Sequence, residues 1–384
     1  MSQTTRRTLL SAGPLAAAAA FSAQAAAPPP PGPNGEWRNK QSGMAYRRLG
    51  RTGLMISEVV SGGDPITLSN YDHINMALDM GLNYLDMAPA YNKGQTEEAY
   101  GKIIHGSYKR EKVFLTTKVS GFTNFRNAMY KEIYDALPAA KREAYAKRGL
   151  EMRLERGVEK PGYFYEYYPG QRSPIELTYI ANAMRPDFAN KVEGSQKFRD
   201  YIVKSIETSL TRVGTDYFDI LMCPHGTNSP EEMDVPEIRQ TFDRLKKAGK
   251  VRFLGFTSHT DPGGVLAKAA QLGHYDCAMI AYNVINGGYV ERSIREAREK
   301  DMGVIAMKVA MSVATHHKSL QPTPQWRIEK INRVIPGDMK PPLKAYLWAL
   351  QNPNISAVIS NLWDKTHVQE NVSLAGKKVE MQPA

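Results

Sequence analysis

The chain has 384 residues, of which 42% are hydrophobic and 23% charged, and this ordinary globular composition excludes collagen-like, wholly disordered and coiled-coil proteins. Basic residues outnumber acidic ones by 50 to 39 and give a formal net charge of +11, but they are dispersed among acidic neighbours. Because the sequence has no basic stripe interleaved with aromatic residues, we expect no nucleic-acid partner. Two cysteines cannot form a disulfide scaffold, so the hydrophobic core must stabilise the fold.

The first residues have the order of parts that is typical of an export signal. Arg6 and Arg7 precede a small apolar run that ends near Phe21. Ala25 then completes an Ala-x-Ala cleavage site. The paired arginines resemble a twin-arginine signal, whose machinery exports proteins after they have folded. We therefore predict a signal peptide over residues 1–25, the twin-arginine export machinery as a partner, and a periplasmic or secreted location. An alanine-rich N-terminus with two chance arginines is the alternative.

Residues 26–43 are rich in proline and are expected to form a linker, which leaves 44–384 as the folded domain. After the first 27 residues, no apolar run approaches the roughly 18 residues that span a bilayer, so we expect no stable membrane span in the mature protein. His316 and His317 are adjacent, which is not metal-ligand spacing. With no His-Glu-x-x-His or Cys-x-x-Cys motif either, we expect no metal site.

The domain alternates short apolar strands with helical patterns. Helical stretches end at Gly81, Gly249, Gly273 and Gly303, each just before an apolar strand, as glycine caps do. Eight buried-type strands occur around residues 59–60, 84–85, 113–117, 218–222, 252–256, 278–281, 304–307 and 357–360. Eight strands alternating with helices predict an α/β fold closed into a (β/α)8 TIM barrel. A doubly wound open sheet is the alternative, but no Gly-x-Gly-x-x-Gly opens a helix after any of these strands.

Two segments depart from this alternation. Ahead of the first strand, residues 44–57 predict a β-hairpin that closes the bottom of the barrel. After the third strand, residues 122–195 are too long for an ordinary loop and are predicted to form an inserted subdomain or lid, with a charged helix over 141–160. The aromatic stretch 163–168 should lie at the end of the barrel where TIM barrels carry their chemistry. A lid that stacks on carbohydrate and an insertion that packs on itself are the two interpretations.

Four polar residues near the strand ends form a chemically coherent group. Asp86, Lys118 and His225 are the first polar residues after strands two, three and four. Tyr91 follows in the same loop as Asp86. A buried Lys118 held charged by Asp86 would lower the pKa of Tyr91, whose hydroxyl could then protonate a substrate oxygen. His225 can donate a hydrogen bond to that oxygen. The group has no electron source, which implies a bound hydride donor, and it has no second carboxylate as a glycoside hydrolase would need.

The order of these residues resembles the aldo-keto reductase family. The segments that carry the resemblance are 81–91, 116–118, 205–219 and His225. The resemblance implies an oxidoreductase that uses NADP or NAD on a small carbonyl or sugar substrate. It also implies that Tyr91 is the general acid/base and that His225 orients the carbonyl. Asp86 and Lys118 would then tune the tyrosine.

The resemblance further points to nucleotide-binding positions, several of which carry unusual residues. They are Ser258, His259, Met279, Met307, Asn361, His367, Glu370 and Asn371. His367 stands where the family often has an arginine, a strong bidentate phosphate partner, so NADP and NAD both stay open. Because free NADPH is not expected outside the cytoplasm, one hypothesis is a cofactor enclosed by an aromatic lid over 162–170 and recycled in place. A nucleotide- or sugar-binding barrel without redox turnover is the alternative function.

Overall fold

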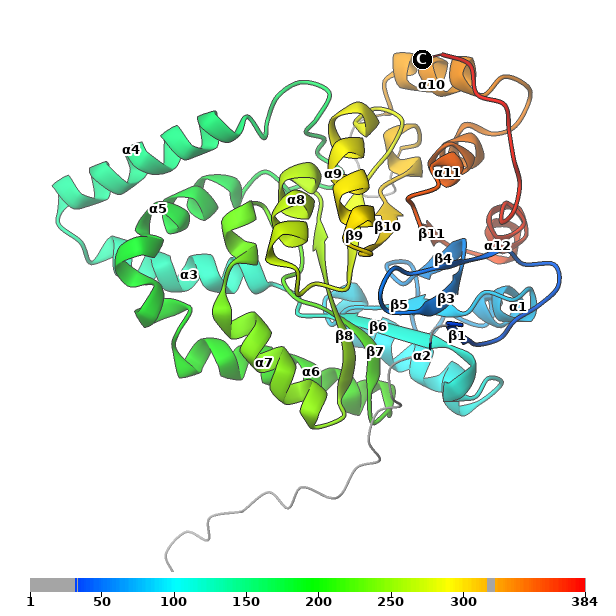
Figure 1. The fold of residues 1–384 in the computed structure, drawn as a ribbon, viewed down its shortest axis with the longest axis horizontal. Helices are drawn as coiled ribbons and strands as arrows, with labels where there is room; N and C mark the ends of the chain where they lie inside the picture. Colours follow the sequence, from blue (N-terminus) through cyan, green and yellow to red (C-terminus); the bar gives the residue numbers. More distant parts are fainter. Residues whose placement is uncertain (1–31, 33, 316–321, 384) are drawn as a thin grey trace, which may run out of the picture.

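The structure is a computed structural model that describes residues 32, 34–315 and 322–383. Eight parallel strands form a closed barrel in the order β10-β11-β4-β5-β6-β7-β8-β9 (Figure 1). The barrel strands are β4 (Val59–Gly62), β5 (Tyr84–Asp86), β6 (Phe114–Lys118), β7 (Phe218–Met222), β8 (Val251–Ser258), β9 (Cys277–Ala281), β10 (Gly303–Met307) and β11 (Ala357–Asn361). The predicted TIM barrel is therefore confirmed and the open sheet is excluded. The predicted signal peptide lies outside the described residues.

Helices surround the barrel and bury one apolar face each. They are α1 (His73–Asp79), α2 (Gln95–His105), α6 (Gln196–Val213), α7 (Pro236–Lys247), α8 (Pro262–Leu272), α9 (Gly287–Glu299), α10 (Gln325–Val334), α11 (Pro341–Gln351) and α12 (Lys365–Val372). In α6, for example, Phe198, Ile202 and Ile206 recur every four residues and are all buried. Among the described residues, no helix combines the length and the apolar character that crossing a membrane would need.

A second, smaller core fills the inside of the barrel. Its members include Tyr84, Phe114, Ile220, Met279 and Met307, which come from five different strands. The Tyr84 hydroxyl accepts a hydrogen bond from Thr116, so this buried phenol keeps a polar partner. Both cysteines are buried and free. Because side chains pack the barrel interior, the space open to ligands lies at its ends.

An N-terminal sheet closes the bottom of the barrel. The predicted hairpin is present as β2 (Tyr46–Arg48) and β3 (Leu54–Ser57), and Leu49, Leu54 and Ile56 belong to the inner core. Gly50 has a positive φ of 49° and sits against β10, where an added Cβ would lie 2.1 Å from the Gly303 nitrogen. A third strand, β1 (Glu36–Trp37), pairs with β3 in parallel. It was not predicted, because two residues within a predicted linker carry no strand periodicity.

Beneath the same end of the barrel lies a buried cluster of charges. The Asp219 carboxylate is fully buried and forms ion pairs with Arg38, Arg110 and Arg252. Burial opposes ionisation, but Arg110, Arg38 and Arg252, together with the Leu115 amide, lower the pKa of Asp219 to about 2. Arg38 follows β1, whereas Asp219 lies on β7 and Arg252 on β8. The cluster therefore joins the N-terminal sheet to the barrel wall.

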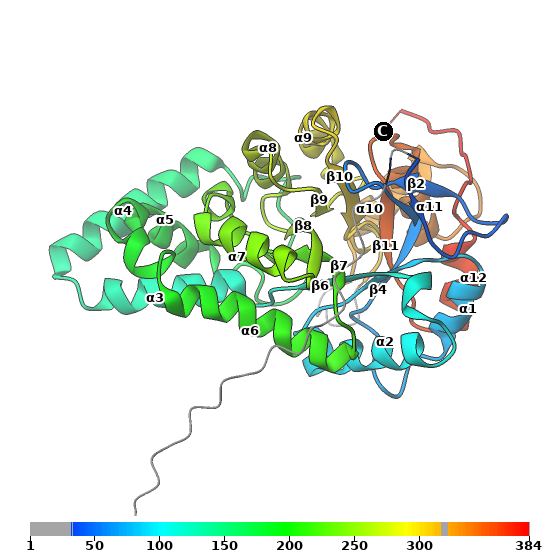
Figure 2. The same ribbon diagram turned by 60° about the horizontal axis from the view of Figure 1, so that its bottom comes forward.

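The long insertion forms three helices that extend to one side of the barrel. They are α3 (Phe122–Asp135), α4 (Ala139–Arg156) and α5 (Ile175–Val192). Figures 1 and 2 both show α4 and α5 on the side opposite α1 and α12. The charged helix predicted over 141–160 is therefore present as α4. Between β10 and α11 the chain forms α10, and His316 and His317 lie outside the described residues.

We predict that Asp219→Asn destabilises the fold by about 3 to 5 kcal/mol, because it leaves buried guanidinium groups without a compensating charge. Urea unfolding measures this loss. Asp243→Asn is the matched control, since Asp243 forms an exposed i,i+4 pair with Arg239, and it should leave the midpoint unchanged.

The stability that Asp219 provides should depend on pH in a direction that its pKa defines. The folded pKa of Asp219 is about 2, below its ordinary value near 4. The ionised Asp219 therefore adds to the free energy of unfolding above pH 4, and this addition is lost as the pH falls from 4 to 2. Equal stability of wild type and Asp219→Asn at pH 7 would contradict this role.

Candidate active site

A buried ion pair occupies the C-terminal ends of two neighbouring barrel strands. Asp86 ends β5 and Lys118 ends β6, and the side chains are 2% and 1% exposed. Lys118 Nζ donates to Asp86 Oδ1 and to the Met87 carbonyl oxygen at 2.9 Å. Burial raises the pKa of Asp86 and lowers that of Lys118, while the attraction between the two groups opposes both shifts. The structure thus places both residues as the sequence analysis predicted.

Tyr91 stands directly above this pair. Lys118 Nζ lies 4.7 Å from the centre of the Tyr91 ring, within cation–π distance. The two residues after the tyrosine, Asn92 and Lys93, have positive φ values of 47° and 56°, which turn the chain sharply. Asn92 Nδ2 donates to the carbonyl oxygens of Asp64 and Ile66 at 2.7 and 2.9 Å. This strained turn is therefore anchored to the loop after β4, and it fixes the position of the tyrosine.

The pKa of Tyr91 shifts opposite to the direction predicted from the sequence. Burial raises it well above its ordinary value, and the nearby carboxylates Asp86 and Asp64 raise it further. Lys118 faces the ring, and Asp86 accepts one of its hydrogen bonds, so the lysine charge is offset. The expectation of a lowered tyrosine pKa is therefore wrong, and Tyr91 is a stable proton donor at neutral pH.

His225 is held by the neighbouring strand. Its Nδ1 lies 2.8 Å from Thr257 Oγ1, and the same oxygen accepts a hydrogen bond from the Gly226 amide at 2.8 Å. Burial, followed by the charges of Lys118 and Lys308, lowers the pKa of His225 to about 3. The imidazole is therefore neutral at physiological pH. When the Thr257 hydroxyl donates to Nδ1, the ring carries its proton on Nε2.

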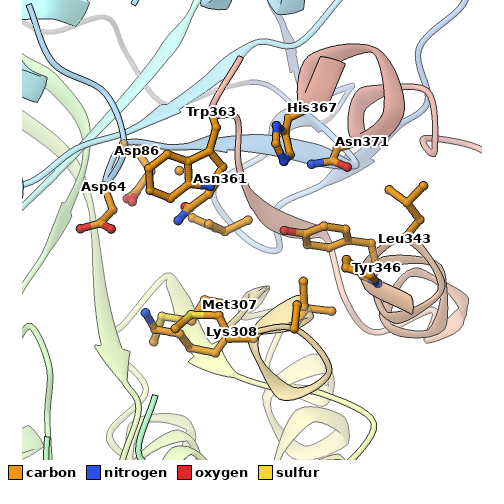
Figure 3. A pocket seen from close by; sticks show the side chains of 18 of the residues that line it. Asp64, Asp86, Met307, Lys308, Leu343, Tyr346, Asn361, Trp363, His367 and Asn371 are labelled. Carbon is orange, nitrogen blue, oxygen red and sulfur yellow. The ribbon is translucent and has the colours of Figure 1, made fainter. Parts of the chain in front are cut away.

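A cleft of about 500 Å³ extends from Asp86 to His367 and Asn371 of α12 (Figure 3). Tyr91 also lines it. Seven of the eight predicted nucleotide positions line it: His259, Met279, Met307, Asn361, His367, Glu370 and Asn371. Ser258 does not line the cleft, and its assignment to the cofactor stays a prediction. Its side chain is fully buried, and its hydroxyl donates to the Thr227 carbonyl oxygen at 2.8 Å.

The cleft also contains residues that sequence reasoning did not find. Asp64 follows the first barrel strand, Lys308 follows β10, and Tyr346 comes from α11. Asp64 could have been predicted from the sequence, because it is the first polar residue after the first barrel strand and follows Gly62 and Gly63. An added Cβ on Gly63 would lie 2.3 Å from the Asp86 carbonyl oxygen. Tyr346 carries no such signal, because its position on a helix face is that of an ordinary core residue.

The residues of the cleft fit a dinucleotide. Met307, Trp363 and Tyr346 give it flat or apolar walls (Figure 3), which suit aromatic rings, while Asn361 and Asn371 offer polar atoms. Among the described residues, no group of three His, Cys, Asp or Glu side chains could hold a metal ion.

A second cavity of about 530 Å³, which we call the side cavity, lies between the cleft and the insertion. Its lining includes Asn124 and Asn127 of α3, Tyr168 and Gln171 of the insertion, and His225 and His259. His259 lines the cleft as well. The catalytic candidates thus lie where two cavities meet.

Most aromatic residues of segment 162–170 pack in the core and do not line the cleft. Tyr163, Phe164, Tyr165 and Tyr167 are buried in the main core, and the lining of the cleft includes no residue of this segment within the described chain. Tyr168 nevertheless lies beside the cleft residues His259 and Lys308, at 5.6 Å between ring centres and 5.4 Å from Nζ, so the aromatic lid over a bound cofactor stays a hypothesis. Self-packing is the better interpretation, except for Tyr168, which is half-buried beside the side cavity.

Comparison with known proteins agrees with this geometry. The model of the aldo/keto reductase family matches residues 67–183 and 180–381. The uncharacterized oxidoreductase YqkF of Bacillus subtilis is 25% identical over 218 residues, which cover 56% of this chain and 49% of that protein. The L-galactose dehydrogenase of Arabidopsis thaliana is 27% identical over 202 residues, which cover 47% and 60%. The chain spans about half the length of the curated relatives it matches.

Solved structures share the fold. The holo form of the aldo-keto reductase AKR11C1 from Bacillus halodurans superposes with a TM-score of 0.55 and covers 88% of this chain and 92% of that one, at 19% identity. At 19% identity, this similarity shows only that the two proteins share the barrel fold. The family model, however, matches residues 67–183 and 180–381, which together cover more than half of the chain. The chain therefore belongs to the aldo/keto reductase family.

Proposed function

We propose that this protein is an oxidoreductase that transfers a hydride between a nicotinamide dinucleotide in the cleft and a carbonyl or alcohol substrate. The observation that carries this proposal is Tyr91, which lines the inner end of the cleft above the buried pair of Lys118 and Asp86. When bound there, the dinucleotide supplies the hydride that no side chain can provide. An aldehyde, a ketone or a sugar is the proposed substrate, and the sugar is supported by the name of the Arabidopsis relative.

Each residue has a defined part in this proposal. Tyr91 gives its hydroxyl proton to the substrate oxygen during reduction and takes it back during oxidation. His225, with its proton on Nε2, donates a hydrogen bond to the same oxygen and so orients it. Lys118 and Asp86 hold Tyr91 in place, because moving the buried ammonium would break its bonds to Asp86 and Met87.

The far end of the cleft bears on the choice between NADP and NAD. His367 contacts the Asp364 carboxylate at 3.0 Å, and Lys340 contacts Glu370 at 2.5 Å. Each of these basic side chains therefore already has a carboxylate partner, which weakens its attraction for the additional phosphate of NADP. We infer that the cleft takes NAD as readily as NADP.

Export by the twin-arginine route is a separate proposal, supported by the order of charge, apolar run and cleavage site in residues 1–25. Changing both Arg6 and Arg7 to lysine should block export, because lysine keeps the charge but loses the guanidinium fork. Cell fractionation with detection of the processed chain measures this. Wild-type amounts of processed protein in the periplasm would contradict the proposal.

Tyr91→Phe should lower kcat for carbonyl reduction by about 10²- to 10⁴-fold, because only the proton donor is lost. Dinucleotide affinity, measured by fluorescence titration, should stay unchanged. Tyr275→Phe is the matched control, since this buried tyrosine donates to the Met233 carbonyl oxygen away from the cleft. Near wild-type turnover of Tyr91→Phe would overturn the assignment, and dinucleotide binding without any turnover of wild type would favour a binding protein instead.

The pH profile gives a further test. Because the pKa of His225 is about 3 and that of Tyr91 is raised, both groups keep their protons unchanged between pH 5 and pH 9. We therefore predict that kcat/KM for reduction is flat over this range and falls only as the pH approaches 3. An inflection near pH 6.5 that disappears in His225→Gln would show that the histidine titrates normally, which contradicts the structure.

A further inference from the structure

We infer that the insertion after β6 positions His225, and that Glu232 is the residue through which it does so. Glu232 belongs to the short helix η3 (Pro230–Met233), which follows β7 and the loop that carries His225. It lines neither the cleft nor the side cavity, so we assign it a positioning role. The inference rests on the proposed function, because His225 is the residue proposed to orient the substrate oxygen.

The loop after β7 needs support on two sides. Gly226, directly after His225, has a positive φ of 72°, and an added Cβ would meet no atom within 4 Å. A glycine in open space can adopt many backbone conformations. On the barrel side, the amides of Gly226 and Thr227 donate to the Thr257 hydroxyl and carbonyl oxygens at 2.8 and 2.9 Å. The other end of the loop, residues 228–229, contacts the insertion.

The Glu232 carboxylate fastens this second end of the loop. It is fully buried, and its Oε1 accepts hydrogen bonds from the amides of Asn228 and Ser229 at 2.9 and 3.0 Å. One carboxylate oxygen thus fixes two successive peptide groups. Burial raises the pKa of Glu232, whereas the charge of Arg126 and the hydrogen bonds to the carboxylate lower it. A carboxylate buried in this way is stable only where such partners are provided.

The insertion supplies the remaining partners of Glu232. Thr123 of α3 donates a hydrogen bond to its Oε2, and the fully buried guanidinium of Arg126 attracts the carboxylate. Arg126 is held in turn by Glu193, which accepts from its Nε at 2.8 Å. A hydroxyl and a charge from one helix of the insertion therefore hold the carboxylate that holds the loop.

A second helix of the insertion, α5, contacts the same loop. Asn182 Nδ2 donates to Ser229 Oγ at 2.9 Å. Thr178 Oγ1 accepts from Asn228 Nδ2 at 3.3 Å. From the barrel side, Thr260 donates to Asn228 Oδ1 at 2.9 Å. The loop is thus enclosed between the insertion and the segment after β8, and directional bonds of this kind in a buried place favour one arrangement of the backbone.

The test observes the ring of His225 directly, by nitrogen NMR of protein that carries isotope-labelled histidine. We expect a single neutral tautomer in the wild type, because Nδ1 has a fixed partner in Thr257 Oγ1 at 2.8 Å. His225→Gln removes this signal and so assigns it. Thr123→Val exchanges the hydroxyl for a methyl group, and Glu232→Leu removes the carboxylate. In both variants the signal should shift toward the average of the two tautomers, because the loosened loop releases the ring.

Two further variants separate positioning from general stability. Glu232→Gln keeps an oxygen for the two loop amides, so it should preserve the wild-type signal of His225. Tyr134→Phe is the matched control. Tyr134 also belongs to α3, but its hydroxyl donates to the Arg142 carbonyl oxygen at 3.2 Å, inside the insertion. Its loss should leave the His225 signal unchanged.

The inference is overturned if the His225 signal is unchanged in both Thr123→Val and Glu232→Leu. It is also overturned if Glu232→Gln alters the signal as much as Glu232→Leu does, since the hydrogen bonds would then not be what positions the loop. Should Glu232→Leu fail to fold, Thr123→Val decides the question, because it leaves every charge in place.

Reduction of hexanal keeps this inference separate from the proposed function. We expect Glu232→Leu and Thr123→Val to lower kcat about tenfold, because displacing an orienting group slows the reaction, while dinucleotide affinity stays unchanged. If the variants alter the His225 signal as expected but the wild type reduces no carbonyl, the insertion positions His225 and the oxidoreductase assignment fails. If reduction depends on Tyr91 but no variant alters the signal, the proposed function stands and this inference fails.

Discussion

The buried ion pair between Lys118 and Asp86 is the interaction on which the arrangement of the site depends. Both side chains are almost completely buried, and a charge in such a place is costly unless it is paired and hydrogen-bonded. A pair of this kind adds little to stability compared with apolar residues of the same size. Its value here is geometric, because it places an ammonium under the ring of Tyr91 and limits how that ring can move.

The two ends of the barrel carry out different tasks. At the bottom, Asp219 and its arginines join the N-terminal sheet to the barrel, and the inner core seals the space between the ends. At the top, the strands end in polar side chains that would be unstable in a packed core. The stable end therefore supports the reactive end, as is usual in TIM barrels. The insertion adds to the reactive end without changing the barrel, because it leaves and rejoins between β6 and α6.

Much of this could be predicted because it follows from local patterns. Eight strands and the hairpin show in the alternation of apolar runs and turn residues, and Asp86, Lys118 and His225 could be placed together because parallel strands end at one face. The pKa of Tyr91 could not be predicted, since it depends on burial and on Asp64 from a different loop. That His259 lines the cleft whereas Ser258 does not could not be predicted either, because successive side chains along a strand point to opposite sides and the sequence does not show which side faces the cleft. Tyr346 and the path of the insertion depend on tertiary packing, which no local pattern encodes.

The most direct test of this account is a double-mutant cycle between Asp86 and Tyr91, measured as kcat for carbonyl reduction in Asp86→Asn, Tyr91→Phe and the double variant, with near-UV circular dichroism as the check on folding. If the ion pair acts through the tyrosine, Asp86→Asn lowers kcat in the wild-type background and has almost no further effect once the Tyr91 hydroxyl is absent. If the two losses multiply independently, the ion pair does not act by positioning Tyr91, and the central claim is contradicted.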